Sequence, residues 1–474
     1  MTGETTLSEG LHPAEITKDL LTEADKANRL GTDPIGKLLL QYALPAIIGM
    51  TVSSLYNIID RIFIGNGVGP LAISGLALTM PLMNLTIAFG AMIGAGASTM
   101  ISIRLGQKRK RDATNILGNT LILNMIIGSL ITFFGLIFLD PLLRAFGASE
   151  GTLPYARDFM QIILLANLFN HNFMGLNNIM RASGYPKKAM WSSLLTVFVN
   201  ICLAPVFIFI FNWGIRGAAL ATAIAQCSGF IWVMIHFMKK SSYLHFQRGF
   251  FKLKKRIIRD ILSIGLSPFL MNVGASMVAM IINISLSKYG GVHSDMAIGA
   301  FGIINSVALL FIMTVMGLNM GMQPIAGYNF GALQNDRVLK VYKLTLIAAS
   351  VVTTFGFALA MLFPTAIVSA FTNDADLIEQ SKLAMSYVML MFPIIGFQMV
   401  TANFFQSIGK ASYAIFLSLS RQFLFLIPLL LLLPLRFGLN GVWMALPCSD
   451  LLATIVTVLF VFTQTKKVLE RKKI

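Results

Sequence analysis

The stretch Leu38–Asn66 constrains the fold of this chain more than any other segment. It is almost wholly apolar, and at about 1.5 Å per residue a helix of this length crosses a hydrocarbon core of about 30 Å. One acidic residue, Asp60, lies deep in its second half. An ionisable group inside a membrane costs about 2.5–3.5 kcal/mol on insertion scales, so we interpret Asp60 as a candidate functional residue. The alternative is that Asp60 lies at the membrane boundary beside Arg61 and remains hydrated.

The composition indicates that the whole chain is a membrane protein. Of its 474 residues, 56% are hydrophobic and only 12% are charged, whereas a soluble domain carries about 25% charged residues. Repeated apolar windows of about 20 residues indicate an all-α polytopic membrane protein. The net charge of +17 lies in short loops, so it gives no indication of nucleic-acid binding. Three cysteines, Cys202, Cys227 and Cys448, lie in apolar runs without the spacing of metal ligands, so we expect packing roles and no metal cofactor.

Twelve apolar runs predict twelve transmembrane helices. They lie near residues 38–66, 71–103, 115–139, 155–181, 187–211, 215–238, 257–288, 295–320, 338–363, 377–407, 411–434 and 439–463. When alternate loops are assigned to one side, most of the 37 Lys and Arg gather on the side that carries both termini. The positive-inside rule therefore predicts that both termini are cytoplasmic.

The second half of the chain repeats the first. Gly106 in LGQKRKRDA corresponds to Gly331 in FGALQNDRV. The segment NIMRASGYPKKAMWSSL from Asn178 corresponds, at the same offset, to NFFQSIGKASYAIFLSL from Asn403. Because six helices restore the original direction of the chain, the repeat is parallel, with its axis along the membrane normal.

This repeat predicts two six-helix lobes. We expect a cytoplasmic N-terminal segment at 1–37, an N-lobe at 38–238, a cytoplasmic linker at 239–256, a C-lobe at 257–463 and a cytoplasmic tail at 464–474. Such a duplication is typical of transporters that work by alternating access. A channel would show a re-entrant filter or rings of charge. A membrane enzyme would need clustered His, Cys or carboxylates, but only His171 lies well inside a predicted helix, so we expect no enzymatic activity.

Polar residues gather on one face of the first predicted helix. Ser53, Tyr56, Asn57 and Asp60 follow i, i+3, i+4, i+7 spacing. A polar stripe facing lipid is costly, so this face is expected to point into the bundle or into a hydrated cavity. Buried there, Asp60 would exchange a proton near physiological pH, or hold dehydrated Na⁺ with amide and hydroxyl oxygens. The alternative is a structural hydrogen-bond network between helices.

The two halves differ in polarity. The fourth predicted helix carries several asparagines, and in the second half Asn283 takes the position that corresponds to Asp60. We interpret these residues as candidates for the substrate cavity, together with polar residues of the first helix and one acidic residue near the C-terminus. The set is Tyr56, Ser53, Asn167, Asn170, Asn178, Asn283 and Asp450.

Asp450 has a second interpretation. It lies well inside an apolar run, and Arg421 is the one deep basic residue of the sequence. Since the two lie on neighbouring predicted helices, we favour a buried ion pair that neutralises itself. A contact between Asp450 and substrate is the alternative.

The sequence resembles the multidrug and toxic compound extrusion (MATE) family. The matching motifs are YNIIDRIFIG, RASGYPKKA, GIRGAALATAIAQ and GLNMGMQPIAGYNFGALQNDRV, and the similarity runs from about Pro34 to the C-terminus. The resemblance implies a V-shaped pair of six-helix lobes, antiport driven by H⁺ or Na⁺, and export of cationic amphiphilic compounds. Asp60 matches the acidic residue that forms part of the family's first-lobe cation site.

The match has two departures at acidic positions. The family's fifth helix often has Asn, three residues, Asp and Pro, but here Asn200 is followed by Ala204 and Pro205. Asn200 and Thr222 remain the predicted partners of Asp60 in cation coupling, along with Asn57. The acidic residue that some members carry on the seventh helix is also missing. A site with one carboxylate favours H⁺, because dehydrating Na⁺ calls for several oxygen ligands.

We therefore predict a monomeric exporter of small organic cations in a bacterial inner membrane. It would be coupled to H⁺ or Na⁺ and would need no other cofactor and no nucleic acid. The alternative is a lipid-linked oligosaccharide flippase of the same superfamily. Its large anionic substrate would call for several deep basic residues, whereas the sequence suggests Arg421 alone.

Overall fold

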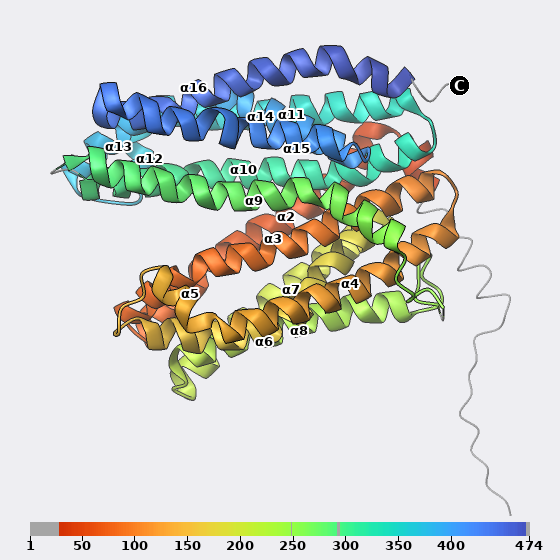
Figure 1. The fold of residues 1–474 in the computed structure, drawn as a ribbon, viewed down its shortest axis with the longest axis horizontal. Helices are drawn as coiled ribbons and strands as arrows, with labels where there is room; N and C mark the ends of the chain where they lie inside the picture. Colours follow the sequence, from red (N-terminus) through yellow and green to blue (C-terminus); the bar gives the residue numbers. More distant parts are fainter. Residues whose placement is uncertain (1–27, 248, 292–293, 471–474) are drawn as a thin grey trace, which may run out of the picture.

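A computed structural model of the chain describes residues 28–247, 249–291 and 294–470. All regular secondary structure in these ranges is helical, as Figure 1 shows. Most of the predicted N-terminal segment, residues 1–27, and the end of the predicted tail, residues 471–474, lie outside the described part.

The helices lie close to the predicted ranges. The first half contains α2 (Ile35–Gly67), α3 (Pro70–Gly106), α4 (Lys110–Ile137), α5 (Leu139–Ala145), α6 (Leu153–Ala182), α7 (Pro186–Pro205), the π-helix η1 (Val206–Ile210) and α8 (Gly214–Met238). The second half contains α9 (Lys255–Tyr289), α10 (Ser294–Gly331), α11 (Asn335–Leu362), α12 (Pro364–Ser369), α13 (Ala375–Val388), α14 (Phe392–Ser407), α15 (Ala411–Leu419), the π-helix η3 (Ser420–Leu426) and α16 (Ile427–Glu470).

Nine helical stretches of the described part are long and apolar enough to span a membrane, or ten when α13 and α14 count as one bent span. This differs from the predicted twelve for two reasons. The stretch Ala411–Gln464 counts once, although its 54 residues would extend about 80 Å at 1.5 Å per residue. Its backbone leaves the helical region at Gly438, so the chain reverses there (Figure 1). Helix α6 is the other reason, since it has 30 residues but carries many asparagines.

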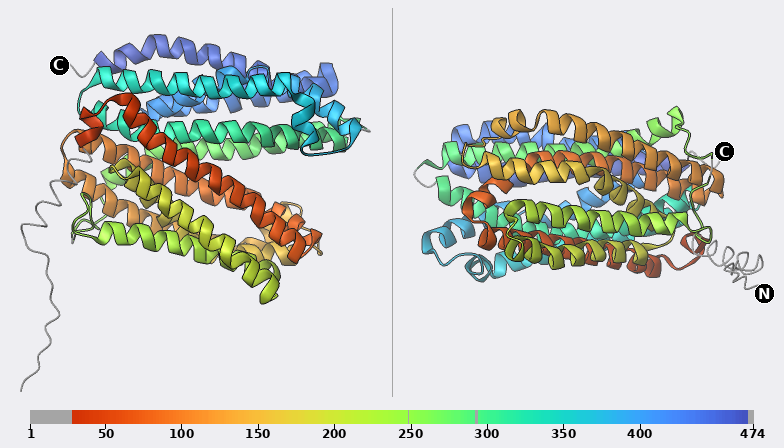
Figure 2. Two further views of the ribbon diagram at one scale, coloured as in Figure 1. Left: turned by 180° about the vertical axis from the view of Figure 1, so that it is seen from behind. Right: turned by 90° about the horizontal axis from the view of Figure 1, so that it is seen from below.

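The helices form two lobes that share a core at one end only. One hydrophobic cluster joins Ile101 of α3 to Ile261 of α9 and Ile325 of α10. Two further clusters each belong to a single lobe, one around Leu164 and the other around Trp443. The lobes therefore meet at the end that carries the linker and the C-terminus and diverge towards α5 and α12, as Figure 1 and Figure 2 show.

Close backbone approach closes the shared end. Gly265 of α9 lies against the carbonyl group of Met92, and Gly331 of α10 lies against that of Ile103. Neither position has room for a Cβ atom, so α3 packs directly on the backbones of both C-lobe helices.

Buried polar residues extend α10 beyond its predicted end at residue 320. Gln323 donates from Nε2 to Ser98 Oγ at 3.0 Å and to Thr99 Oγ1 at 2.8 Å. Asn329 donates from Nδ2 to the Leu30 carbonyl at 2.9 Å. These polar side chains resemble the end of a span in the sequence, but partners in the N-lobe and in the segment before it satisfy them, and the helix continues to Gly331.

Candidate functional site

Three predicted residues from three helices meet in the N-lobe. Asn200 of α7 donates from Nδ2 to Tyr56 Oη of α2 at 3.1 Å and to Thr222 Oγ1 of α8 at 2.9 Å. The hydroxyl groups of Tyr56 and Thr222 are 3.3 Å apart. Asn200 is 2% exposed, so α2, α7 and α8 are joined by a buried polar network. The structure thus brings together Asn200 and Thr222, which the family resemblance suggested, and Tyr56, which the helical spacing suggested.

Asp60 lies one helical turn beyond Tyr56 on α2. It is 8% exposed, and its Oδ1 atom is buried without a hydrogen-bond partner. Arg61 is exposed, and its Nη2 contacts Met80 Sδ at 4.0 Å instead. No ion pair within the described residues involves Asp60. The carboxyl group is therefore buried, as expected for a functional residue, and forms no ion pair with Arg61. A buried carboxylate oxygen without a donor is costly, and binding a proton or a cation would relieve that cost.

The side chain of Asn57 lies outside the described part, so its predicted role stays a prediction. Asn167 is 2% exposed, and its Nδ2 atom has no hydrogen-bond partner among the described residues. Asn170 is half-buried on the same helix. His171 faces Thr86, with its Nε2 atom 2.9 Å from the Thr86 carbonyl oxygen. This contact joins α6 to α3.

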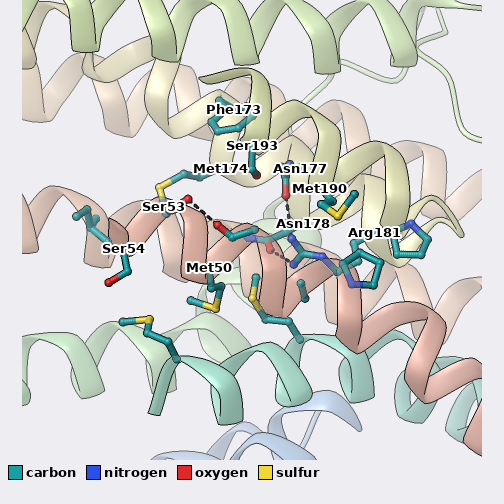
Figure 3. A pocket seen from close by; sticks show the side chains of 17 residues that line it. Met50, Ser53, Ser54, Phe173, Met174, Asn177, Asn178, Arg181, Met190 and Ser193 are labelled. Atoms are coloured by element: carbon teal, nitrogen blue, oxygen red, sulfur yellow. Dashed lines mark hydrogen bonds between the residues drawn. The ribbon is translucent and has the colours of Figure 1, made fainter. Parts of the chain in front are cut away.

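A cavity of about 410 Å³ lies between α2, α6 and α7, with two methionines of α10 on its C-lobe side. Ser53 and Asn178, both predicted candidates for the substrate cavity, are among its lining residues. Figure 3 shows them with Arg181. Several methionines supply the apolar walls, namely Met50, Met174, Met190, Met313 and Met320.

Arg181 is the functional candidate that the sequence reasoning missed. It is 8% exposed, whereas the side chain of Arg421 is 30% exposed. The expectation that Arg421 is the one deep basic residue is therefore wrong. Arg181 stands at the end of a predicted helix, shortly before Lys187 and Lys188. The sequence therefore predicts that its charge lies in the loop. The neighbouring amides Asn177 and Asn178 were the available signal for a buried position.

Asp450 and Arg421 form the predicted ion pair, with 2.5 Å between Nε and Oδ1. Asp450 is 1% exposed, and Gln398 donates from Nε2 to its backbone carbonyl at 2.6 Å. Arg421 lies in η3, where the π-helical turn displaces the backbone. Asn283 is exposed on α9, and Asp450 pairs with Arg421. Neither residue joins the polar network around Asp60.

Known proteins of similar sequence and structure are transporters. The sequence profile of the MatE family matches residues 45–206 and 268–432, one block in each half. The multidrug export protein MepA of Staphylococcus aureus (strain MSSA476) is 27% identical over 429 residues, which cover 90% of this chain and 94% of that protein.

Two solved structures share the fold. The MATE multidrug transporter DinF-BH is 37% identical, with a TM-score of 0.84 over 92% of this chain and 97% of that one. An outward-facing multidrug resistance MATE family transporter is 25% identical, with a TM-score of 0.87 over 94% of this chain and 98% of that one. The family profile covers more than half of the sequence, and both structures span almost all of it. This polytopic membrane protein therefore belongs to the MatE family of multidrug efflux transporters.

Proposed function

We propose that this protein exports amphiphilic organic cations in exchange for a cation, with H⁺ favoured over Na⁺. The observation that carries this proposal is Asp60, a buried carboxylate whose Oδ1 atom has no hydrogen-bond partner. Its side chain lies one turn from the network of Tyr56, Asn200 and Thr222. A similar network without a free carboxylate oxygen would only hold the helices together.

Asp60 would couple ion and substrate through its charge. When ionised, it favours a hydrated or cation-occupied N-lobe, and when protonated it can pack against apolar neighbours. Tyr56 links any movement of α2 to α7 and α8 through Asn200. H⁺ is favoured because Ala204 stands where a second carboxylate would be, and a Na⁺ site calls for several oxygen ligands.

The substrate class rests on the relatives, and the cavity supports only the size of the substrate. MepA is described as a multidrug export protein, and a cavity of about 410 Å³ lies in the range of drug-sized sites, about 300–1,000 Å³. A lipid-linked oligosaccharide would need a much larger space.

The proposed orientation has both termini in the cytoplasm of a bacterial cell, because most of the Lys and Arg lie on that side. In this orientation the lobes diverge towards the outside.

Transport by reconstituted vesicles tests the proposal. The purified protein is placed in liposomes with an imposed H⁺ gradient or, separately, an imposed Na⁺ gradient, and movement of an ethidium-type dye is followed by fluorescence. Dye movement that depends on the H⁺ gradient supports the proposal. Failure to move dye under either gradient, together with movement of a labelled lipid-linked sugar, would favour the flippase.

A further inference from the structure

The cavity between α2, α6 and α7 contains a positive charge that export of organic cations does not explain. Arg181 lines this cavity and is 8% exposed. Among the described residues no carboxylate forms an ion pair with it. The charges nearest along the chain, Lys187 and Lys188, are exposed and also positive. A simple organic cation in this cavity would therefore be repelled.

The guanidinium group of Arg181 is held in place from two sides. Its Nη1 donates to Asn178 Oδ1 at 3.1 Å, and its Nη2 donates to Asn177 Oδ1 at 3.0 Å. Asn177 is itself oriented by α7, because its Nδ2 donates to the Ala189 carbonyl at 2.9 Å and to Ser192 Oγ at 2.7 Å. Figure 3 shows Asn177 and Asn178 close to Arg181. The arginine is thus a fixed donor group and not a flexible surface side chain.

The amide oxygens and the C-terminal end of α6 offset only part of this charge. Arginine has five N–H donors, and the two hydrogen bonds to asparagine occupy two of them. A carboxylate or phosphate group can accept two parallel hydrogen bonds from one guanidinium, and such charge-assisted bonds are stronger than bonds to neutral amides. The unbalanced charge and the donors that have no partner within the described ranges therefore fit an anionic group.

The rest of the cavity fits an apolar body. Methionine side chains from α2, α6, α7 and α10 line it, including Met50, Met174 and Met190. Methionine is flexible and polarisable, so such walls adapt to chains and rings of different shape. Ser53 adds a hydroxyl group from α2 at the same cavity.

We propose that this cavity binds amphiphiles that carry an anionic group, with Arg181 holding the carboxylate or phosphate and the methionines packing on the apolar part. The substrate range would then include zwitterionic and anionic amphiphiles in addition to cations. This inference rests on equilibrium binding, so it stands or fails separately from gradient-driven export.

Binding of two matched eight-carbon probes tests the inference. The full chain is placed in phosphatidylcholine nanodiscs, and equilibrium dialysis measures radiolabelled octanoate and octyltrimethylammonium. We expect saturable octanoate binding near one equivalent, and at least about tenfold weaker binding of octyltrimethylammonium. Arg181→Gln should weaken octanoate binding by roughly 10- to 100-fold, the ratio that a charge-assisted hydrogen bond supplies, while Lys239→Gln, which removes an exposed charge, should leave it unchanged.

A second variant keeps Arg181 and fills the cavity. A Cβ at Gly49 would meet only Ser193 Cβ, at 4.0 Å, so Gly49→Leu can place its side chain in the cavity without backbone strain. It should also abolish octanoate binding, and it decides the question if Arg181→Gln does not fold.

The proposal is overturned if octanoate binds no better than octyltrimethylammonium, or if a folded Arg181→Gln binds octanoate as the unaltered protein does. If Arg181→Gln does not fold, unchanged octanoate binding by Gly49→Leu overturns it. In that case Arg181 only caps α6.

Nanodiscs containing phosphatidylglycerol distinguish the source of the anion. Competition with octanoate identifies a lipid phosphate as the occupant, and the lack of competition identifies a soluble amphiphile.

Discussion

Arg337 of α11 forms hydrogen bonds with the chain just before α2. We expect these bonds to set the balance between the state that is open at the diverging end of the lobes and the state that is open at the other end. Its Nη2 donates to the carbonyl oxygens of Leu30 at 3.1 Å and Asp33 at 2.7 Å, and its Nε donates to Asn329 Oδ1 at 2.8 Å. Leu30 is fully buried. The segment that leads into the N-lobe is therefore tied to the C-lobe at the closed end of the protein.

Arg337→Ala removes these three hydrogen bonds. Hydrogen bonds to charged groups contribute about 1.5–3 kcal/mol each when buried. Arg337 is only half-buried, so we take the three together as roughly 2 kcal/mol, which corresponds to about a 30-fold shift in equilibrium. A state in which the diverging end is closed, if populated at about 1%, would then rise to roughly a quarter of the molecules.

Double electron–electron resonance measures this shift directly. Spin labels at Ser149→Cys and Asn373→Cys lie in exposed loops of the two lobes at the diverging end, in a background where the three native cysteines are replaced. We expect a new short distance in Arg337→Ala. An unchanged distance distribution in a folded Arg337→Ala protein would refute the reasoning that the hydrogen bonds of Arg337 hold the closed end together.

Three further substitutions test other parts of the structure. Tyr56→Phe removes the hydroxyl that accepts from Asn200 and should lower the stability by about 0.5–1.5 kcal/mol, measured by thermal melting in detergent; an unchanged melting temperature would argue against the network. Arg421→Leu leaves the buried charge of Asp450 unpaired and should cost up to about 3–5 kcal/mol, whereas the double variant with Asp450→Leu should recover most of it. Equal loss in single and double variants would contradict a self-neutralising pair. Gly265→Leu should force the closed end apart, and the spin labels should then report the same short distance. Retention of the original distance would show that the contact between α9 and α3 tolerates a side chain.

Much of the fold was predictable because it follows from apolar length and from the internal repeat. The polar face of α2 was also predictable, since the spacing of Ser53, Tyr56 and Asp60 needs only helical geometry. Thr222 lies more than a hundred residues from Tyr56 in the sequence, and only the family resemblance suggested that the two would meet.

The remaining features depend on tertiary contacts that the sequence does not display. Gln323 and Asn329 resemble residues at the end of a membrane span until their partners in the N-lobe and in the segment before it are known. Arg181 is followed by two exposed lysines, which favour a loop position, and only the neighbouring amides Asn177 and Asn178 indicate a buried one. Asn283 corresponds to Asp60 in the repeat, yet it is exposed whereas Asp60 is buried.

The central claim is that Asp60 couples export to a cation gradient, and one transport measurement tests it most directly. Proteoliposomes carrying the unaltered protein, Asp60→Asn or Glu150→Gln are compared for dye export driven by an imposed H⁺ gradient. Glu150 is the matched control, since its side chain is 83% exposed. We predict that Glu150→Gln transports normally and that Asp60→Asn inserts and folds but loses gradient-driven export. Normal gradient-driven export by Asp60→Asn would contradict the account.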